Sequence, residues 1–142
     1  MTSGRPMQLP LQSRIDDFLN GSPHAVVGAS RDRSKYGNKV LRCYIQACRS
    51  VFPVNPAAAE IEGLPAFKNL ASLPTRVHGV SIITPPAVTL QVVKDAHAAG
   101  ITRLWMQPGA ESPEAVELAR SLGLSVIAGD ACILVVLGFA DH

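Results

Sequence analysis

Short apolar segments alternate with amphipathic segments along most of the chain, and this alternation limits the possible folds more than any other feature of the sequence. Each apolar segment is long enough for a β-strand but too short for a helix. Segments that are apolar throughout are typical of strands buried on both faces of a parallel sheet. The five segments are HAVVGAS (24–30), SVFPVNP (50–56), VHGVSIIT (77–84), TRLWMQ (102–107) and LSVIAG (124–129).

The segments between these predicted strands carry helix signals. Over about 36–49, apolar residues recur at the spacing of one helix face. Helices over 85–99 and 113–122 are predicted, with Thr84 and Ser112 as N-caps, because proline follows each cap and a glycine follows each helix. The remaining predicted elements are a helix over 11–20, a short edge element at 63–67 and a helical turn at 68–73.

Strands that alternate with helices predict an α/β fold. They form βαβ units, which are almost always right-handed and place the strands side by side in a parallel sheet. We therefore expect a doubly wound, mainly parallel sheet of about five strands with helices on both faces. The 142 residues show no internal repeat or linker, so a single domain over residues 1–142 is predicted.

Composition excludes several classes of protein. Hydrophobic residues make up 47% of the chain and charged residues 17%, which excludes a disordered chain. The net charge of +2, without a basic tract, gives no reason to expect nucleic acid as a partner. The longest apolar run, at 131–140, is far shorter than the ~20 residues of a spanning helix, so no membrane partner is expected.

The three cysteines, Cys43, Cys48 and Cys132, form no CxxC pair. Neither a disulfide framework nor a metal site is therefore predicted, and a reducing, cytoplasmic location is expected. The apolar run at 131–140 is also compatible with a homodimer.

The turns after four of the predicted strands form the candidate site, because ligands of open α/β sheets bind outside the carboxyl ends of the strands. Gly28 lets the backbone approach a ligand, and Ser30 can donate a hydrogen bond to a phosphate oxygen. Each turn alone has an ordinary structural interpretation, and only the four together favour a ligand site. The turns are Gly28-Ala29-Ser30, Pro53-Val54-Asn55-Pro56, Thr84-Pro85-Pro86 and Gln107-Pro108-Gly109.

A phosphate-containing ligand is favoured, since three cations lie beside the predicted N-terminus of the second helix. They are Arg31, Arg33 and Lys35. A dinucleotide site would have G-x-G-x-x-G and an acidic residue after the second strand, whereas this chain has one glycine and Val54-Asn55. No P-loop motif occurs either. A nicotinamide-dependent oxidoreductase is therefore disfavoured but stays open.

The motifs VVGAS, PVNP, ITPP and WMQPGAES occur in this order, and with them the chain resembles the small CoA-binding protein family from about residue 13 to 133. That family is similar to the N-terminal CoA-binding domain of the succinyl-CoA synthetase alpha subunit. The resemblance implies a Rossmann-like fold that binds coenzyme A or an acyl-CoA along the carboxyl edge of the sheet.

The resemblance also implies roles for particular residues. The phosphates would lie at Gly28, Ala29 and Ser30, near Lys35 and Asn38. The adenosine end would be lined by Pro53, Val54, Asn55 and Pro56. The remaining implied site residues are Thr84, Pro85, Pro86, Gln107 and Gly109.

Two departures from the family pattern concern basic residues. Ala57 occupies the position of a lysine, so Arg31 or Arg33 is expected to hold the 3′-phosphate in its place. Asp130-Ala131-Cys132 replaces an Asp-Arg-Cys motif. Cys132 is expected to be a small buried side chain, with a mixed disulfide to CoA as the alternative.

No catalytic residues are predicted. The phosphorylated histidine of the synthetase belongs to a second domain that the resemblance does not include, and no carboxylate pair is placed for acid-base chemistry. The expected function is a stand-alone, non-catalytic CoA-binding module that acts as a sensor, carrier or partner subunit. The alternatives are the oxidoreductase and a CoA-binding subunit of an acyl-CoA synthetase whose catalytic half is another chain. The histidines outside the four turns are His24, His78, His97 and His142.

Overall fold

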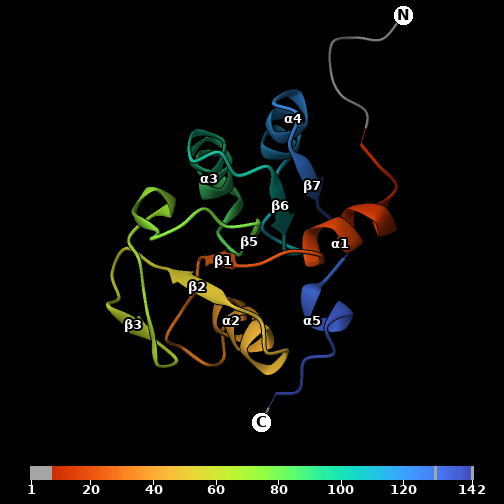
Figure 1. Ribbon diagram of the computed structural model, residues 1–142. Helices are drawn as coiled ribbons and strands as arrows, with labels where there is room; N and C mark the ends of the chain where they lie inside the picture. Colours follow the sequence, from red (N-terminus) through yellow and green to blue (C-terminus); the bar gives the residue numbers. More distant parts are fainter. Residues whose placement is uncertain (1–7, 130, 142) are drawn as a thin grey trace, which may run out of the picture.

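Five parallel strands form the central sheet of the protein (Figure 1). The computed structural model describes residues 8–129 and 131–141. The strand order is β2-β1-β5-β6-β7, and every neighbouring pair is parallel. The predicted α/β fold class is therefore confirmed. The strands are β1 (His24–Val27), β2 (Val51–Val54), β5 (Gly79–Ile82), β6 (Arg103–Met106) and β7 (Ser125–Ile127).

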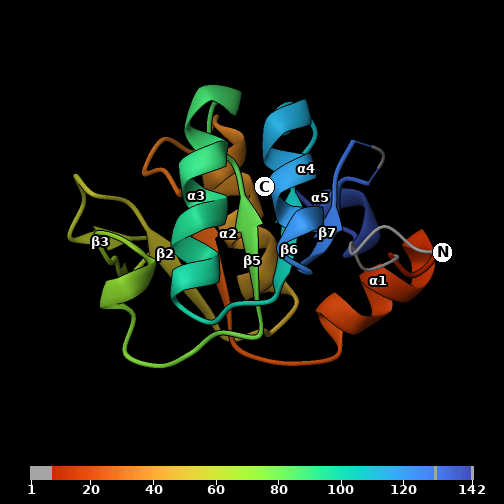
Figure 2. The same ribbon diagram turned by 90° about the horizontal axis from the view of Figure 1, so that it is seen from above.

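The direction of winding reverses at β1. The chain first adds β2 on one side of β1 and then returns to add β5 on the other side. The helices that follow β1 and β5 therefore lie on opposite faces of the sheet, as the two views show (Figures 1 and 2). Such a switch point leaves a crevice at the carboxyl ends of the two strands, which is the usual ligand position in this fold.

Two hydrophobic clusters fill the two faces of the sheet. Alternate residues of a strand point to opposite faces, so Ala25 and Val27 pack on the side of α3 and α4, whereas Val26 packs on the side of α1, α2 and α5. On β6, the fully buried Trp105 lies on the second side. The helices are α1 (Leu11–Leu19), α2 (Tyr36–Gln46), α3 (Pro86–Ala98), α4 (Pro113–Ser121) and α5 (Ile133–Val136).

The connection from β2 to β5 contains small elements in place of a long helix. An antiparallel hairpin of β3 (Glu60–Ile61) and β4 (Leu64–Pro65) is followed by the 3-10 helix η1 (Leu70–Ser72). Between them, Phe67 forms a parallel bridge with Val54, which extends the sheet beyond β2. The edge element and the helical turn predicted for this region are therefore confirmed.

Some helix boundaries differ from those predicted. α2 ends at Gln46 because Cys48 adopts a left-handed conformation (φ 57°). The prediction of Thr84 as an N-cap is wrong: Pro85 occupies the N-cap of α3, and the Thr84 hydroxyl is hydrogen bonded to that of Thr89 at 2.8 Å. Ser112 does cap α4, since its Oγ accepts a hydrogen bond from the Ala115 N–H at 3.1 Å.

The last described segment packs against α2. Ile133 is fully buried in the hydrophobic cluster between α2 and the sheet, so part of the apolar run at 131–140 belongs to the core of this chain. Val135 remains exposed. Asp141 forms an ion pair with Arg42 of α2 at 2.9 Å. This contact holds the pKa of the Asp141 carboxyl below its usual value. Within the described part of the chain, no helix combines the length and the apolar character that crossing a membrane requires.

His24 is a structural residue at the start of β1. Its side chain is fully buried beside the rings of Phe18 and Tyr44, and its Nε2–H donates to the Phe18 carbonyl at 2.7 Å. Nδ1 has no hydrogen-bond partner among the described residues. Burial lowers the pKa of His24 to about 4, so this imidazole is neutral in the folded protein at neutral pH.

Stability should therefore depend on His24 between about pH 6.5 and pH 4. In the unfolded chain His24 binds a proton near its ordinary pKa, whereas in the folded protein it does so only near 4, so acidification favours unfolding in this window. Across it, we expect about 3 kcal/mol of unfolding free energy to be lost through this group. Urea unfolding of the wild type and His24→Gln at several pH values measures the effect.

The glutamine variant should lose much less stability over the same range, because glutamine keeps an N–H donor and does not titrate. The exposed His97 provides the control, and His97→Gln should follow the wild type. Equal pH dependence in the wild type and His24→Gln would contradict the assignment.

Candidate functional site

A groove with two lobes lies at the carboxyl ends of the strands around β1 and β5. The β2 lobe is a hollow of about 440 Å³ whose lining includes Val54, Asn55 and Pro56. The β6 lobe, of about 330 Å³, has Gln107, Pro108 and Gly109 in its lining. The wall common to both lobes comes from the turns after β1 and β5. It consists of Gly28, Ser30, Lys35, Ile83, Thr84 and Pro85.

The middle of the groove is set by close backbone contacts at Gly28. This residue has φ +93°, and a Cβ on it would collide with the Ile83 carbonyl. Gly37, in the first turn of α2, lies so close to the Gly28 carbonyl that a Cβ there would collide with it as well. Glycine is needed at both positions because any side chain would push the turn, α2 and the end of β5 apart.

The loop between Gly28 and α2 is ordered by its own polar groups. Ser30 Oγ accepts from the Asp32 N–H at 3.0 Å, and Asp32 Oδ1 accepts from the Ser34 N–H at 2.9 Å and from its hydroxyl at 2.7 Å. The hydrogen bonds from Ser34 hold the pKa of Asp32 below its usual value. Because Ser30 Oγ acts here as an acceptor, its hydroxyl proton stays available for a ligand.

The N-terminus of α2 opens onto this groove. Lys35 is its N-cap residue, and Tyr36 and Gly37 line the β6 lobe. The structure shows no hydrogen bond from the N–H groups of Tyr36 or Gly37 to another described residue. Free N–H groups, the positive end of the helix dipole and the Lys35 ammonium together favour an anion at this point.

Asn38 holds the loop from inside. The residue is fully buried, and its Nδ2 donates to the Ser30 carbonyl at 2.9 Å and to Glu62 Oε2 at 3.0 Å. Its Oδ1 accepts from Arg42 Nε at 2.6 Å. Since its polar atoms are engaged within the protein and it lines neither lobe, Asn38 acts as a positioning residue for the turn.

Asn55 connects the turns after β1 and β2. Its Nδ2 donates to the Ala29 carbonyl at 2.9 Å, and its Oδ1 accepts from the Ala57 N–H at 2.7 Å. Its backbone N–H donates to the Phe67 carbonyl at 2.8 Å, which ties the same turn to the extension of the sheet. The wall of the β2 lobe is therefore held by bonds to two neighbouring segments.

Gln107 performs a similar role in the β6 lobe. It is 4% exposed, and its Nε2 lies 2.9 Å from the Cys132 sulfur while its Oε1 accepts from the Ile133 N–H at 3.3 Å. The Trp105 indole N–H donates to the Ala131 carbonyl at 3.0 Å nearby. Cys132 is half-buried and Cys43 is buried. Burial raises the pKa of the Cys43 thiol to about 11. Asp130, the first residue of the last sequence motif, lies outside the described residues.

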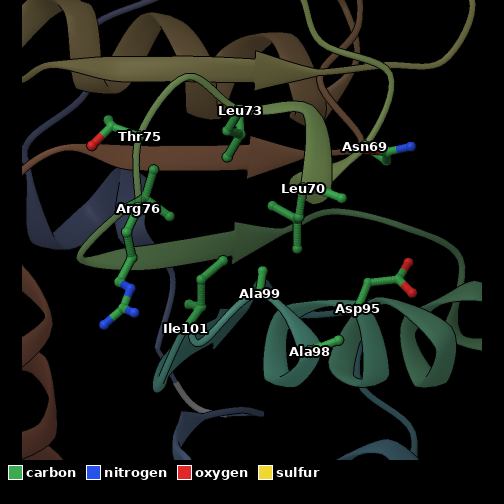
Figure 3. Close-up of a pocket in the computed structure, with 11 residues that line it drawn as sticks. Asn69, Leu70, Leu73, Thr75, Arg76, Asp95, Ala98, Ala99 and Ile101 are labelled. Carbon is green, nitrogen blue, oxygen red and sulfur yellow. The ribbon is translucent and has the colours of Figure 1, made fainter.

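A further hollow of about 540 Å³ lies between η1, the segment after it and α3 (Figure 3). Arg76 and Ile101 lie at one end, and Asn69 and Asp95 lie at the end toward the carboxyl termini of the strands. Asn69, Leu70 and Asp95 also line the β2 lobe, so the two hollows are neighbours. No sequence pattern predicted this hollow.

Residues 23–138 match the protein family described as "CoA binding domain". The match covers more than half of the chain. The chain belongs to this CoA-binding domain family. The resemblance inferred from the four sequence motifs is thereby confirmed.

Relatives of this CoA-binding domain include both longer and similarly sized proteins. It is 29% identical over 130 residues to the acetate–CoA ligase [ADP-forming] II subunit alpha of Pyrococcus furiosus, with 84% of this chain and 28% of that subunit covered. The chain thus spans little more than a quarter of the ligase subunit. The uncharacterized protein YneT of Bacillus subtilis is 27% identical, with 91% of this chain and 96% of YneT covered.

A solved structure of similar size also matches. A conserved hypothetical protein from Pyrococcus furiosus superimposes with a TM-score of 0.77 and 40% identity. The superposition covers 81% of this chain and 98% of that protein.

The structure of this CoA-binding domain brings most of the predicted site residues to the groove. Five do not line either lobe: Arg31 is exposed, Arg33 pairs with Glu62 at 3.5 Å, Asn38 is buried, Pro53 lies within β2, and Pro86 lies in α3. The binding roles of these five and of all the other predicted site residues stay predictions. The predicted residues that line the groove are Gly28, Ala29, Ser30, Lys35, Val54, Asn55, Pro56, Thr84, Pro85, Gln107 and Gly109.

Sequence reasoning missed several residues that line the groove of this CoA-binding domain, among them Gly37, Lys68 and Asp95. For Asp95 a signal existed, since helix spacing places it on the same face as Val88 and Val92, which line the same lobe. Lys68 had no comparable signal, because its position depends on the bridge between Phe67 and Val54.

Proposed function

We propose that this protein binds coenzyme A, or an acyl-CoA, in the two-lobed groove as a stand-alone, non-catalytic module. The observation that carries the proposal is the wall shared by the two lobes, where Lys35 lies beside N–H groups of α2 that have no hydrogen-bond partner among the described residues. In CoA, the diphosphate lies between a nucleotide and a pantetheine arm. The groove has the matching order, with a cationic helix N-terminus between two hollows.

The diphosphate is assigned to the shared wall. Ser30 has a hydroxyl proton available, Lys35 lines both lobes, and the first N–H groups of α2 have no partner in the described chain. Charge-assisted hydrogen bonds of this kind are about twice as strong as neutral ones. This wall therefore supports binding of a phosphate better than any other described part of the groove.

The two ends of CoA are assigned to the two lobes. The β2 lobe combines apolar residues, such as Val54, Val88 and Val92, with polar groups on its rim, as an adenine and a phosphorylated ribose require. The β6 lobe has the smaller volume, and its lining includes Gln107 and Gly109, which suits the pantetheine arm and its thiol.

The non-catalytic assignment is supported by the composition of the β6 lobe. Among the described residues, none of those lining this lobe is a histidine, cysteine, aspartate or glutamate. The lobe that would receive the thiol therefore lacks a carboxylate or imidazole for acid-base catalysis. YneT and the conserved hypothetical protein from Pyrococcus furiosus match this chain over nearly their whole length, which supports a module of this size.

A second candidate function is supported by the match to the acetate–CoA ligase subunit. In this alternative, the protein is the CoA-binding subunit of an acyl-CoA synthetase, and another chain supplies the catalytic groups. The CoA site would be the same in both cases.

Ligand preference can be tested by thermal unfolding with CoA, acetyl-CoA, NAD, NADP and ATP in parallel. CoA and acetyl-CoA should stabilise the protein most, by about 2.7 kcal/mol at a ligand concentration 100 times the Kd. Stabilisation by NAD or NADP without an effect of CoA would contradict the proposal and favour the oxidoreductase.

Catalysis can be tested by incubating the protein with acetyl-CoA, ADP and inorganic phosphate and measuring free thiol. We expect no thiol release above the rate without protein, since the described lining of the β6 lobe contains no carboxylate, imidazole or thiol. Release by this chain alone would contradict the non-catalytic assignment. In the synthetase alternative, release requires the second chain.

The position of the diphosphate can be tested with Ser30→Asp. The carboxylate can still accept from the Asp32 N–H, but it repels a phosphate, so the Kd for CoA should rise at least about tenfold, or about 1.4 kcal/mol. Isothermal titration calorimetry measures the change. Ser13→Asp on the exposed face of α1 is the control and should bind CoA as the wild type does. An unchanged Kd for Ser30→Asp would mean that the diphosphate does not bind at Ser30.

A further inference from the structure

Lys68 lines the β2 lobe, to which the nucleotide is assigned, and its ammonium forms no ion pair with another described residue. CoA differs from ADP and from most other adenine nucleotides by its 3′-phosphate, so recognition of CoA as such requires a positive group in the β2 lobe. The two arginines expected to provide it are poorly placed. Arg31 is exposed and lines neither lobe, and the Arg33 guanidinium pairs with Glu62 at 3.5 Å.

Lys68 lies in the wall of the β2 lobe together with Asn55 and Pro56. Its position follows from the backbone. Phe67 donates its N–H to the Pro53 carbonyl at 3.0 Å and accepts from the Asn55 N–H at 2.8 Å, so this segment runs parallel to the end of β2. In this register Lys68 comes beside the turn that contains Asn55 and Pro56.

The segment that carries Lys68 is fixed on both sides. Before it, the Phe67 ring packs edge-on against Phe52, with the ring centres 5.7 Å apart. After it, Asn69 and Ser72 form a capping box at the start of η1, with Asn69 Oδ1 accepting from the Ser72 N–H at 2.9 Å. The backbone is thus held in place while the Lys68 ammonium forms no hydrogen bond or ion pair with the described residues.

The other charged groups in or near the β2 lobe are less suited than Lys68 to binding a 3′-phosphate. Lys35 lies in the shared wall, where the diphosphate is assigned. Asp95 lies on α3, and its Oδ1 accepts from the Gln91 amide at 2.9 Å. Arg76, at the far end of the neighbouring hollow in Figure 3, does not line the β2 lobe. Lys68 is therefore the one described cation that lines the β2 lobe and not the β6 lobe.

We propose that Lys68 binds the 3′-phosphate and gives the protein its preference for CoA over 3′-dephospho-CoA. This inference rests on the proposed function, because it needs the nucleotide in the β2 lobe. The ammonium of lysine is a compact charge on a flexible stem, so it can reach a phosphate on the ribose without movement of the backbone.

The test is isothermal titration calorimetry of the wild type, Lys68→Met and Lys68→Arg with CoA and with 3′-dephospho-CoA. The wild type should bind CoA at least about tenfold more tightly than 3′-dephospho-CoA. Lys68→Met should lose this preference by weaker binding of CoA, with the Kd for 3′-dephospho-CoA changed less than about twofold. Lys68→Arg should keep the preference, since it keeps the charge.

Arg76→Met is the matched control, and Arg31→Met tests the alternative cation; each removes one cation outside the β2 lobe. Both should keep the preference of the wild type. The inference is overturned if Lys68→Met still prefers CoA, if Arg31→Met or Arg76→Met loses the preference, or if the wild type binds both ligands equally. Failure of the wild type to bind either ligand would instead overturn the proposed function, so the two failures are distinguishable.

Discussion

Close contact between backbone segments at Gly28 is the constraint on which the groove depends. The Gly28 carbonyl lies against Gly37, and the Cα of Gly28 lies against the Ile83 carbonyl, so three segments meet without intervening side chains. This contact brings the N-terminus of α2 to the end of β1 at the switch point of the sheet. The position of the wall that the two lobes share therefore follows from packing of the main chain, and the side chains only complete it.

The polar side chains around the groove divide into two groups by their hydrogen bonds. Asn38, Asn55 and Gln107 have their polar atoms engaged with backbone groups or with other side chains, and so they fix the turns relative to one another. Ser30, Lys35 and Lys68 retain donors that no described protein group uses. A preorganised site has this arrangement, because the supporting residues are satisfied before the ligand arrives.

Much of the fold and of the groove could be predicted from the sequence. The five apolar segments gave the sheet, and the turns after β1, β2, β5 and β6 gave most of the groove lining, because parallel strands bring their carboxyl ends to one edge. Local patterns failed at two residues. Thr84 looks like a cap, but Pro85 takes the N-cap position of α3 and the Thr84 hydroxyl pairs with that of Thr89 in the same helix. Arg33 looks like a free cation but pairs with Glu62, which lies in a different connection, so a tertiary contact decides its role.

The segment around Asp141 supports the turn at Ser30 although the two are far apart in the sequence. Asp141 binds Arg42, Arg42 binds Asn38, and Asn38 binds the carbonyl of Ser30. Because synthesis on the ribosome proceeds from the N-terminus, α2 and the turn are made long before this carboxylate is available to Arg42. The chain of hydrogen bonds that supports the turn at Ser30 is therefore completed late in synthesis, when Asp141 has packed against α2.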